Sequence, residues 1–296
     1  MRGYAGEMEF DQPFERLGED AAAAILRETW GIEGATLTRL DTERDDSFRV
    51  STGTTDYLLK VAHPADDPLY VNLQTAAMAY VAEQSVLSVQ GILLTVEGEI
   101  EPEVDGRVAR LLTWLPGSTE HHLDPFEAGR TLGQLSDALS TFDHPAAHRD
   151  FVWDIARLDL VRDLQERFPN EEVAAVFALW NDLDLTTLPR QVIHNDFHPG
   201  NVLSDGSQIT GVLDFGDVVH TARVVDVAVA LCYFGWEDEL IEGFASVVPL
   251  TPEERDALPV LVAARYAQRI LLNQLLGRHD QSSQLAGLRK HLERMN

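Results

Sequence analysis

The sequence predicts a two-lobed α+β protein with a strand-rich first part and a mainly helical second part. Between residues 35 and 115, alternating apolar and polar residues and dense apolar runs predict an antiparallel sheet. After residue 116, apolar residues recur at helical spacing in one segment after another. The tripeptide Leu115-Pro116-Gly117 separates the two parts and is typical of a break between elements. We therefore expect one lobe over residues 1–115 and a second over residues 116–296.

The order expected in the first lobe is helix, strands, helix, strands. An Ala-rich helix begins at Glu19 and ends at Trp30, because Gly31 is a typical residue just beyond a helix. Strands are expected at 35–40, 48–52 and 56–62, a helix at 72–84, and two or three strands within 91–115. The Asp105-Gly106 pair predicts a tight turn between the last of them.

The second lobe is expected to be helical apart from three short strands. Helices are predicted over 125–142, 153–167, 171–183, 222–234, 236–244, 252–277 and 281–295. The strands are predicted at 191–193, 201–204 and 208–213.

The charge balance and composition exclude several classes of protein. With 49 acidic and 23 basic residues, the chain would repel nucleic acid, whose binding depends on Lys and Arg contacts to phosphate. No uninterrupted apolar run is long enough for a membrane helix, and the acidic N-terminal segment does not resemble a signal peptide. Cys232 is the single cysteine, so we expect no disulfide framework and a cytoplasmic location.

The chemistry is concentrated in two neighbouring segments, QVIHNDFHPGNVL at 191–203 and GVLDFGD at 211–217. Asn201 follows Asp196 by five residues, and Asp214 follows Asn201 by thirteen, with a hairpin predicted between them. This pattern matches the catalytic loop and the Asp-Phe-Gly metal site of kinases. Asp214 and Asn201 offer the hard oxygen ligands that Mg²⁺ requires, and Asp196 can accept the proton of an attacking hydroxyl. Gly216 lets the chain turn sharply.

Other interpretations of the same residues were weighed. His194 is expected to bond a neighbouring backbone carbonyl rather than to react. His194 and His198 have a spacing that a zinc site could use, but no further histidine cluster completes it. Lys60 interrupts the apolar strand DYLLKVA, so its ammonium needs a partner, which in a kinase would be the nucleotide phosphates; an edge-strand lysine is the alternative.

With those motifs in place, the chain resembles the aminoglycoside phosphotransferase and choline kinase family, and within it hydroxylysine kinase and the phosphotransferase domains fused to class III aminotransferases. The likeness extends to the stretches at 40–50, 56–66, 142–154 and 226–234. It implies a protein-kinase-like fold that binds ATP or GTP with Mg²⁺.

The resemblance also implies roles for individual residues. Lys60 is implied as the phosphate-binding lysine, with Ser47 at the turn of the phosphate loop. Asp196 is implied as the base and Asn201 and Asp214 as metal ligands. The run RLLTW at 110–114, including Leu112 and Trp114, is implied to line the adenine pocket, and Asp226 is implied to support the catalytic loop.

Two departures from the family pattern stand out. A short polar turn, Asp45-Asp46-Ser47, replaces a glycine-rich loop. The helix position that should hold a glutamate for Lys60 is Gln74, which accepts a hydrogen bond from an ammonium but cannot neutralise it.

The function expected is phosphorylation of an amino alcohol or hydroxy amino acid similar to hydroxylysine. An acidic run at 237–242 is a candidate for binding a cationic acceptor, although such runs more often form a solvated helix face. An antibiotic phosphotransferase and a nucleotide-binding pseudokinase remain as alternatives. The sequence predicts no oligomeric state.

Overall fold

The protein consists of an antiparallel sheet with two flanking helices, followed by a mainly helical region, in agreement with the α+β class expected. The computed structural model describes residues 14–42, 44–278 and 280–295. The acidic segment discussed above as unlike a signal peptide lies largely in residues 1–13, outside the described residues. Within the described chain, no helix has the length and apolar character that crossing a membrane requires.

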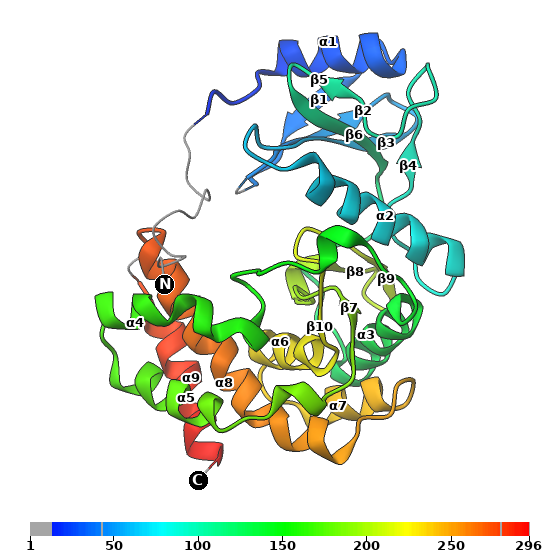
Figure 1. Ribbon diagram of the computed structural model, residues 1–296. Coiled ribbons are helices and arrows are strands. Elements are labelled where there is room, and N and C mark those ends of the chain that lie inside the picture. The colour runs from blue at the N-terminus through cyan, green and yellow to red at the C-terminus, as the bar shows by residue number, and fades with distance from the viewer. Residues whose placement is uncertain (1–13, 43, 279, 296) are drawn as a thin grey trace.

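The sheet has the strand order β1-β2-β3-β6-β4, with β5 paired to β6, and every pairing is antiparallel. Its strands are β1 (Thr36–Arg39), β2 (Asp46–Ser51), β3 (Asp56–Val61), β4 (Ile92–Leu93), β5 (Glu103–Val104) and β6 (Arg107–Thr113). The expected turn joins β5 to β6, where both Asp105 and Gly106 have positive φ. Helices α1 (Glu19–Trp30) and α2 (Pro68–Gln84) flank the sheet on opposite faces (Figure 1).

The two faces of the sheet have different chemistry, because successive side chains of a strand point to opposite sides. Phe48, Val50, Leu59 and Leu111 pack with α1 in one apolar cluster. By this alternation the residues between them point to the other face of the sheet, the one along which α2 lies (Figure 1). This alternation places Lys60, which follows Leu59, on the inner face.

The rest of the chain is mainly helical (Figure 1). Its longer helices are α3 (Pro125–Leu139), α4 (Arg162–Arg167), α5 (Glu171–Asn181), α6 (Val224–Phe234), α7 (Asp238–Ala245), α8 (Pro252–Leu275) and α9 (Ser282–Met295). Two small antiparallel pairs lie among them: β7 (Arg190–Ile193) with β10 (Val219–Ala222), and β8 (Val202–Ser204) with β9 (Ile209–Val212). Strand β10 was not predicted.

Two helices of this region cross at very close range. A Cβ added at Gly129 of α3 would overlap the carbonyl oxygen of Leu240, and one added at Gly243 of α7 would overlap that of Phe126. The absence of side chains at both glycines therefore lets the backbones of α3 and α7 touch.

The expected helix over 153–167 is wrong in its first half. Asp154 caps a 3₁₀ segment, η4 (Ile155–Val161), in which Arg157 leaves helical geometry, and a regular helix begins only at Arg162. Asp154 is buried and its Oδ1 accepts bonds from the Ala156 N–H and the Thr221 hydroxyl. Burial raises the pKa of Asp154 to about 6, and these two bonds only partly oppose the effect. The conformation of this segment is thus determined by the hydrogen bonds of the buried Asp154 carboxyl rather than by helical periodicity.

The apolar core forms two clusters. The smaller one joins α1 to the outer face of the sheet. The larger one runs through the helical region and also takes in Leu73, Met78 and Leu112 from the first 115 residues. Helix α2 and the inner face of the sheet are therefore packed on the helical region, and the division at residue 115 stays a prediction.

Candidate active site

The loop that carries Asp196 is held by a buried carboxylate. Oδ2 and Oδ1 of Asp226 in α6 accept the backbone N–H groups of His194 and Asn195, at 3.0 and 2.6 Å. Asn195 has a positive φ of 65°, a conformation that these contacts stabilise. Burial raises the pKa of Asp226, while the two N–H bonds favour its charged form. Asp226 therefore supports the loop, as expected.

His194 links this loop to the segment that precedes Asp214. Its Nδ1 accepts the N–H of Asp196 at 3.3 Å, so Nε2 carries the proton that is donated to the Leu213 carbonyl, 3.0 Å away. Phe215 packs edge-on against the ring. The structural role predicted for His194 is confirmed, because both ring nitrogens are used in holding the backbone.

The carboxylate of Asp196 is reached from three sides. Asn201 Nδ2 donates to its Oδ2 at 2.9 Å, and Arg265 of α8 donates to its Oδ1 at 3.4 Å. His198 Nε2 lies 3.4 Å from Oδ2. The side chain keeps 23% of its surface exposed, so a small molecule can reach it.

Arg265 was not predicted as a residue of the site. It is almost completely buried. Its NH1 donates to the Trp153 carbonyl at 3.0 Å and to Gln268 Oε1 at 2.9 Å. Burial acts to lower the pKa of Arg265, but the nearby Tyr233 and Asp196 help to raise it. An arginine inside an apolar helix pattern was the available signal, because it needs a partner when buried.

Asp214 lies beside Asn201 at the end of the β8–β9 hairpin. The Leu213 N–H donates to the Asn201 carbonyl at 2.8 Å, which brings the two neighbouring side chains to one end of the pair. Asp214 has a φ of 59°, and its Oδ1 accepts the Gly216 N–H at 3.1 Å. The positive charge of Lys60 is the largest cause that lowers the pKa of Asp214.

These two residues fit a divalent metal ion. Asn201 Nδ2 donates both of its hydrogen bonds to Asp196. The amide oxygen therefore points away from Asp196 and is available as a metal ligand. Asp214 is half exposed, and its Oδ2 has no hydrogen-bond donor among the described residues. An amide oxygen and a carboxylate are the donor set that Mg²⁺ uses with waters and phosphate oxygens.

A polar row crosses the inner face of the sheet. Ser47 of β2 is paired with Lys60 of β3, which is paired with Arg110 of β6. The Ser47 hydroxyl is buried and makes no hydrogen bond within the described chain. Lys60 Nζ lies 3.1 Å from Asp45 Oδ2 and 4.0 Å from Asp214 Oδ1. Burial would lower the pKa of Lys60, but the charges of Asp214 and Asp45 raise it overall.

The expected pairing of Gln74 with Lys60 is wrong. Gln74 Oε1 accepts a bond from Arg110 NH2 at 3.1 Å, while Lys60 is paired with Asp45. Lys60 lies beside two carboxylates, those of Asp45 and Asp214, whereas the amide of Gln74 offers no negative charge to attract it. Arg110 is buried, and burial lowers its pKa.

The predicted adenine-pocket residues lie at the end of the sheet next to the helical region. Arg110 was also expected to line this pocket as part of the run 110–114, but its side chain points to α2. Leu112 is buried in the larger apolar cluster. Trp114 is partly exposed, with the Arg49 guanidinium 4.6 Å from its ring. Contact of Leu112 and Trp114 with adenine stays a prediction.

Asp217, the last residue of the segment GVLDFGD, is a second carboxyl near Asp196, and its acid matches the pattern of the family that the sequence resembles. Burial raises its pKa well above the usual range, and the negative charge of Asp196 adds to the effect, while Arg265 opposes it. A carboxyl in these surroundings gains from a cationic partner.

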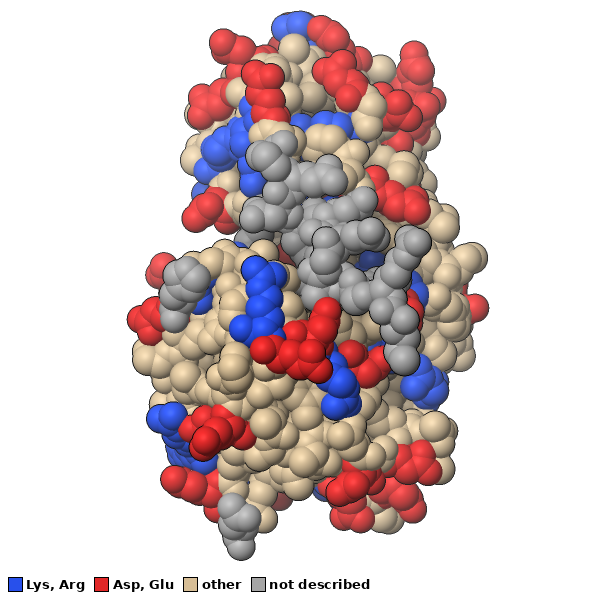
Figure 2. All heavy atoms as spheres, turned by 60° about the vertical axis from the view of Figure 1, so that its left-hand side comes forward, with Lys and Arg blue, Asp and Glu red and all other residues tan. Residues whose placement is uncertain are grey.

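The acidic run at 237–242 is mostly solvated. Glu239 and Glu242 are exposed on α7, and Asp238 Oδ1 accepts bonds from Trp236 and Arg294. Figure 2 shows acidic side chains spread over both the sheet region and the helical region, with Lys and Arg in smaller groups between them. A role of this run in binding a cation stays a prediction.

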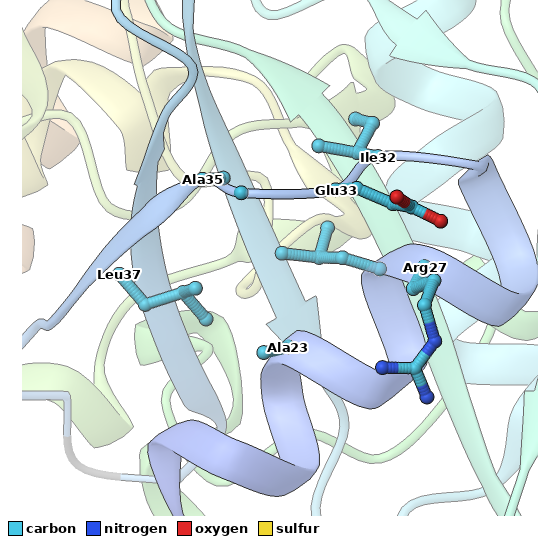
Figure 3. Close-up of a pocket in the computed structure, with 8 residues that line it drawn as sticks. Ala23, Arg27, Ile32, Glu33, Ala35 and Leu37 are labelled. Atoms are coloured by element: carbon cyan, nitrogen blue, oxygen red, sulfur yellow. The ribbon is translucent and has the colours of Figure 1, made fainter.

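One pocket lies away from these residues, on the outer side of the sheet. It has a volume of about 300 Å³ and lies between α1 and β1. Ala23 and Arg27 of α1 line one side, and Ile32 and Leu37 line the other (Figure 3). The alternation of β3 places Lys60 on the opposite face of the sheet, so this pocket is not part of the candidate active site.

Comparison with solved structures identifies the fold as that of protein-kinase-like phosphotransferases. A microcompartment-associated aminopropanol kinase superposes with a TM-score of 0.72 at 20% identity, covering 93% of this chain and 94% of that one. An amicoumacin kinase in complex with AMP-PNP and Ca²⁺ gives a TM-score of 0.72 at 14% identity, covering 92% and 91%.

The sequence comparison defines the family. The model of the phosphotransferase enzyme family matches residues 36–256, and the chain belongs to this family. Hydroxylysine kinase of Mus musculus is 28% identical over 304 residues, which cover 86% of this chain and 81% of the relative. The chain is therefore an ATP-dependent phosphotransferase that acts on a hydroxyl group of a small molecule.

Proposed function

We propose that the enzyme transfers the γ-phosphoryl group of ATP to a hydroxyl of an amino alcohol or hydroxy amino acid similar to hydroxylysine. The observation that carries the proposal is the arrangement around Asp196. Asn201 and Arg265 orient its carboxylate from opposite elements of the fold, at 2.9 and 3.4 Å. A partly exposed, oriented carboxylate at this position is what a hydroxyl acceptor requires.

In the proposed reaction Asp196 accepts the proton of the acceptor hydroxyl as the oxygen attacks the γ-phosphorus. The bond from that phosphorus to the β–γ bridging oxygen breaks, and ADP leaves. Asn201 Oδ1 and Asp214 would hold Mg²⁺, which when bound neutralises charge on the phosphate oxygens. Lys60 would bind phosphate oxygens, and the unpartnered Ser47 hydroxyl beside it would donate a hydrogen bond.

A cationic acceptor is supported by Asp217 together with the relatives. Its carboxyl lies close enough to Asp196 for the negative charge of Asp196 to help raise the pKa of Asp217, and an ammonium group between the two would offset that effect. Hydroxylysine kinase and aminopropanol kinase are both named for acceptors that contain an amine.

An antibiotic acceptor is the second candidate, since the amicoumacin kinase shares the fold over nearly the whole chain. The same catalytic residues would serve either acceptor, because a fold does not determine its substrate. A pseudokinase is less well supported, since Asp196, Asn201 and Asp214 are all present and hydrogen bonds hold each of their side chains.

The test is a coupled ADP-release screen with ATP and with GTP as donors. The acceptors are hydroxylysine, ethanolamine, choline, homoserine, methylthioribose and aminoglycosides. We expect the highest kcat/KM for hydroxylysine or another small amine, and a loss of about 10²- to 10⁴-fold in the Asp196→Asn variant. Efficient turnover of an aminoglycoside alone would favour the second candidate. Stabilisation by Mg·ATP without turnover of any acceptor would favour a pseudokinase, and wild-type rates in the variant would refute the role of Asp196.

A further inference from the structure

A second pocket lies beside the β7–β10 pair and has no part in the proposed reaction. Its volume is about 400 Å³, and the side chains that line it are His148, Arg149, Asp150, Arg190 and His220. Arg190 begins β7, His220 lies in β10, and the other three belong to the loop after the 3₁₀ turn at 145–147. Four of the five lining residues can carry a positive charge, in a chain with a net charge of −26.

The two arginines of the pocket are poorly satisfied within the protein. The side chain of Arg190 is exposed and makes no hydrogen bond or ion pair with the described residues. The Arg149 guanidinium lies 4.6 Å from the Tyr70 ring and 4.2 Å from the Phe151 ring. Its NH2 donates to the Val218 carbonyl at a long 3.4 Å, and its buried Nε has no partner. Elsewhere in the structure most arginines pair with a carboxylate, so this pocket offers unused donors.

The two histidines add further donors. The rings of His148 and His220 lie 4.3 Å apart and are tilted by 32°. His148 Nε2 lies 2.6 Å from Asp143 Oδ1. Burial lowers the pKa of His220, and the positive charges of His148 and Arg190 lower it further, with only Asp143 and a backbone contact acting in the other direction. The charges that Arg149 and Arg190 carry therefore lie in the same cavity as the two imidazole rings.

The acid in the pocket does not cancel these positive charges. Asp150 is in direct contact with the guanidinium of Arg157, which lies outside the lining residues. The negative charge of Asp150 is therefore already compensated from its other side. The side chains of Arg190 and His220 make no hydrogen bond with the described residues, so their donors are available to a ligand.

We propose that this pocket binds a phosphate group, either as inorganic phosphate or as part of a phosphorylated small molecule. Guanidinium groups present forked N–H donors that match phosphate oxygens, and imidazoles add single donors from other directions. The donors come from β7, β10 and the 148–150 loop, so they surround a tetrahedral anion better than a planar one. The volume leaves room for a small substituent on the phosphate.

The pocket adjoins both halves of the candidate active site through the backbone. Strand β7 continues directly into the loop that carries Asp196. The carbonyl of Val218, which Arg149 contacts, lies four residues after Asp214. A phosphate bound here would thus fix the ends of the two segments that present the catalytic carboxylates.

The test follows the imidazole signals of His148 and His220 by NMR, assigned with the His148→Gln and His220→Gln variants. Sodium phosphate replaces sodium chloride at constant ionic strength and neutral pH, without nucleotide or metal. We expect saturable shifts of both signals with inorganic phosphate. The Arg190→Gln variant should bind about tenfold more weakly, as loss of one charge-assisted contact implies. Arg255→Gln, which removes an exposed arginine that forms no ion pair with the described part of the chain, should leave binding unchanged.

Two further arms, with phosphoethanolamine and with acetate, determine the ligand class and the source of the phosphate. Phosphoethanolamine binding more tightly than inorganic phosphate would identify a phosphorylated small molecule as the ligand, and the reverse would identify the free ion. Acetate binding as tightly as phosphate would overturn the assignment to phosphate. The proposal is also overturned if the two signals do not shift, or if they shift equally in Arg190→Gln. Since Arg190 is exposed, its replacement is not expected to disturb folding, and the wild-type positions of the other histidine signals verify this.

Discussion

Lys60 and Asp45 form an ion pair in which Nζ lies 3.1 Å from Oδ2, across the polar turn that opens β2. The lysine that is proposed to bind the nucleotide phosphates is thus held by an acid of the phosphate loop and not by helix α2. Asp45 must release Lys60 when phosphate arrives, and its own charge repels the incoming anion.

The Asp45→Asn variant is therefore expected to bind Mg·ATP several-fold more tightly than the wild type. Isothermal titration calorimetry measures the change in Kd directly. Asp41→Asn is the matched control, because Asp41 is an exposed acid of the same segment. Weaker binding in Asp45→Asn alone would mean that the ion pair holds Lys60 in its binding position instead of competing with the ligand.

Asn201 is predicted to act on the metal as well as on Asp196. In Asn201→Ala the apparent affinity for Mg²⁺ should fall about tenfold or more, because an oxygen ligand is lost, and kcat should fall because Asp196 loses its donor. A titration of the rate with Mg²⁺ at fixed ATP separates the two effects. An unchanged Mg²⁺ dependence with a reduced kcat would leave only the role toward Asp196.

Arg265 is predicted to be a positioning residue for the base. Its replacement by Gln removes the guanidinium that donates to the Trp153 carbonyl and to Gln268, and it leaves Asp196 with one donor fewer. We expect the free energy of unfolding to fall by about 3 kcal/mol in urea denaturation, and kcat to fall at least tenfold with little change in the Kd for ATP. Arg265→Lys keeps the charge but not the fork, and should recover stability only in part. A purely structural role would lower stability without changing kcat of the folded fraction.

Asp154 is predicted to make stability depend on pH. Its pKa is raised from 3.8 to about 6 by burial, so the folded state retains a proton that the unfolded state has lost between these values. Wild-type stability should therefore fall as pH rises from about 4 to 6, by about 3 kcal/mol from this group. In Asp154→Asn this fall in stability between about pH 4 and 6 should disappear. The control Asp163→Asn, at an exposed position, should still show it. Parallel profiles for the wild type and Asp154→Asn would contradict the assignment.

We predict that any side chain at Gly129 destabilises the protein, because α3 and α7 cross at very close range there. The Gly129→Ala methyl would overlap the Leu240 carbonyl, so the helices must separate, at a cost of about 3 kcal/mol. Thermal unfolding followed by circular dichroism measures the loss. Gly18→Ala is the control, because a Cβ there meets open space and φ is −74°. A small loss at Gly129 would show that the crossing can relax.

Local patterns in the sequence were sufficient to predict much of this structure. The class, the helix Glu19–Trp30 and the antiparallel sheet follow from periodicity and from turn residues such as Asp105 and Gly106. The motif spacing predicted that Asn201 and Asp214 would meet, because it contains a hairpin that returns the chain to its starting edge.

The errors arise where a distant partner decides the conformation. Strand β10 is four residues long and exists because β7 pairs with it. Gln74 was assigned to Lys60, since the sequence does not reveal that Arg110 lies in register beside the lysine. Arg265 contributes from more than sixty residues away, at the far end of the chain, and no local period indicates what a buried arginine contacts.

The row formed by Ser47, Lys60 and Arg110 has a consequence for folding. The three residues coincide only when β2, β3 and β6 pair in the observed register. A slip of one residue in β3 would place Leu59 or Val61 beside Ser47 in place of Lys60. A nucleotide that requires all three residues therefore binds only the correctly paired sheet. Its binding free energy stabilises that pairing relative to every mispaired one.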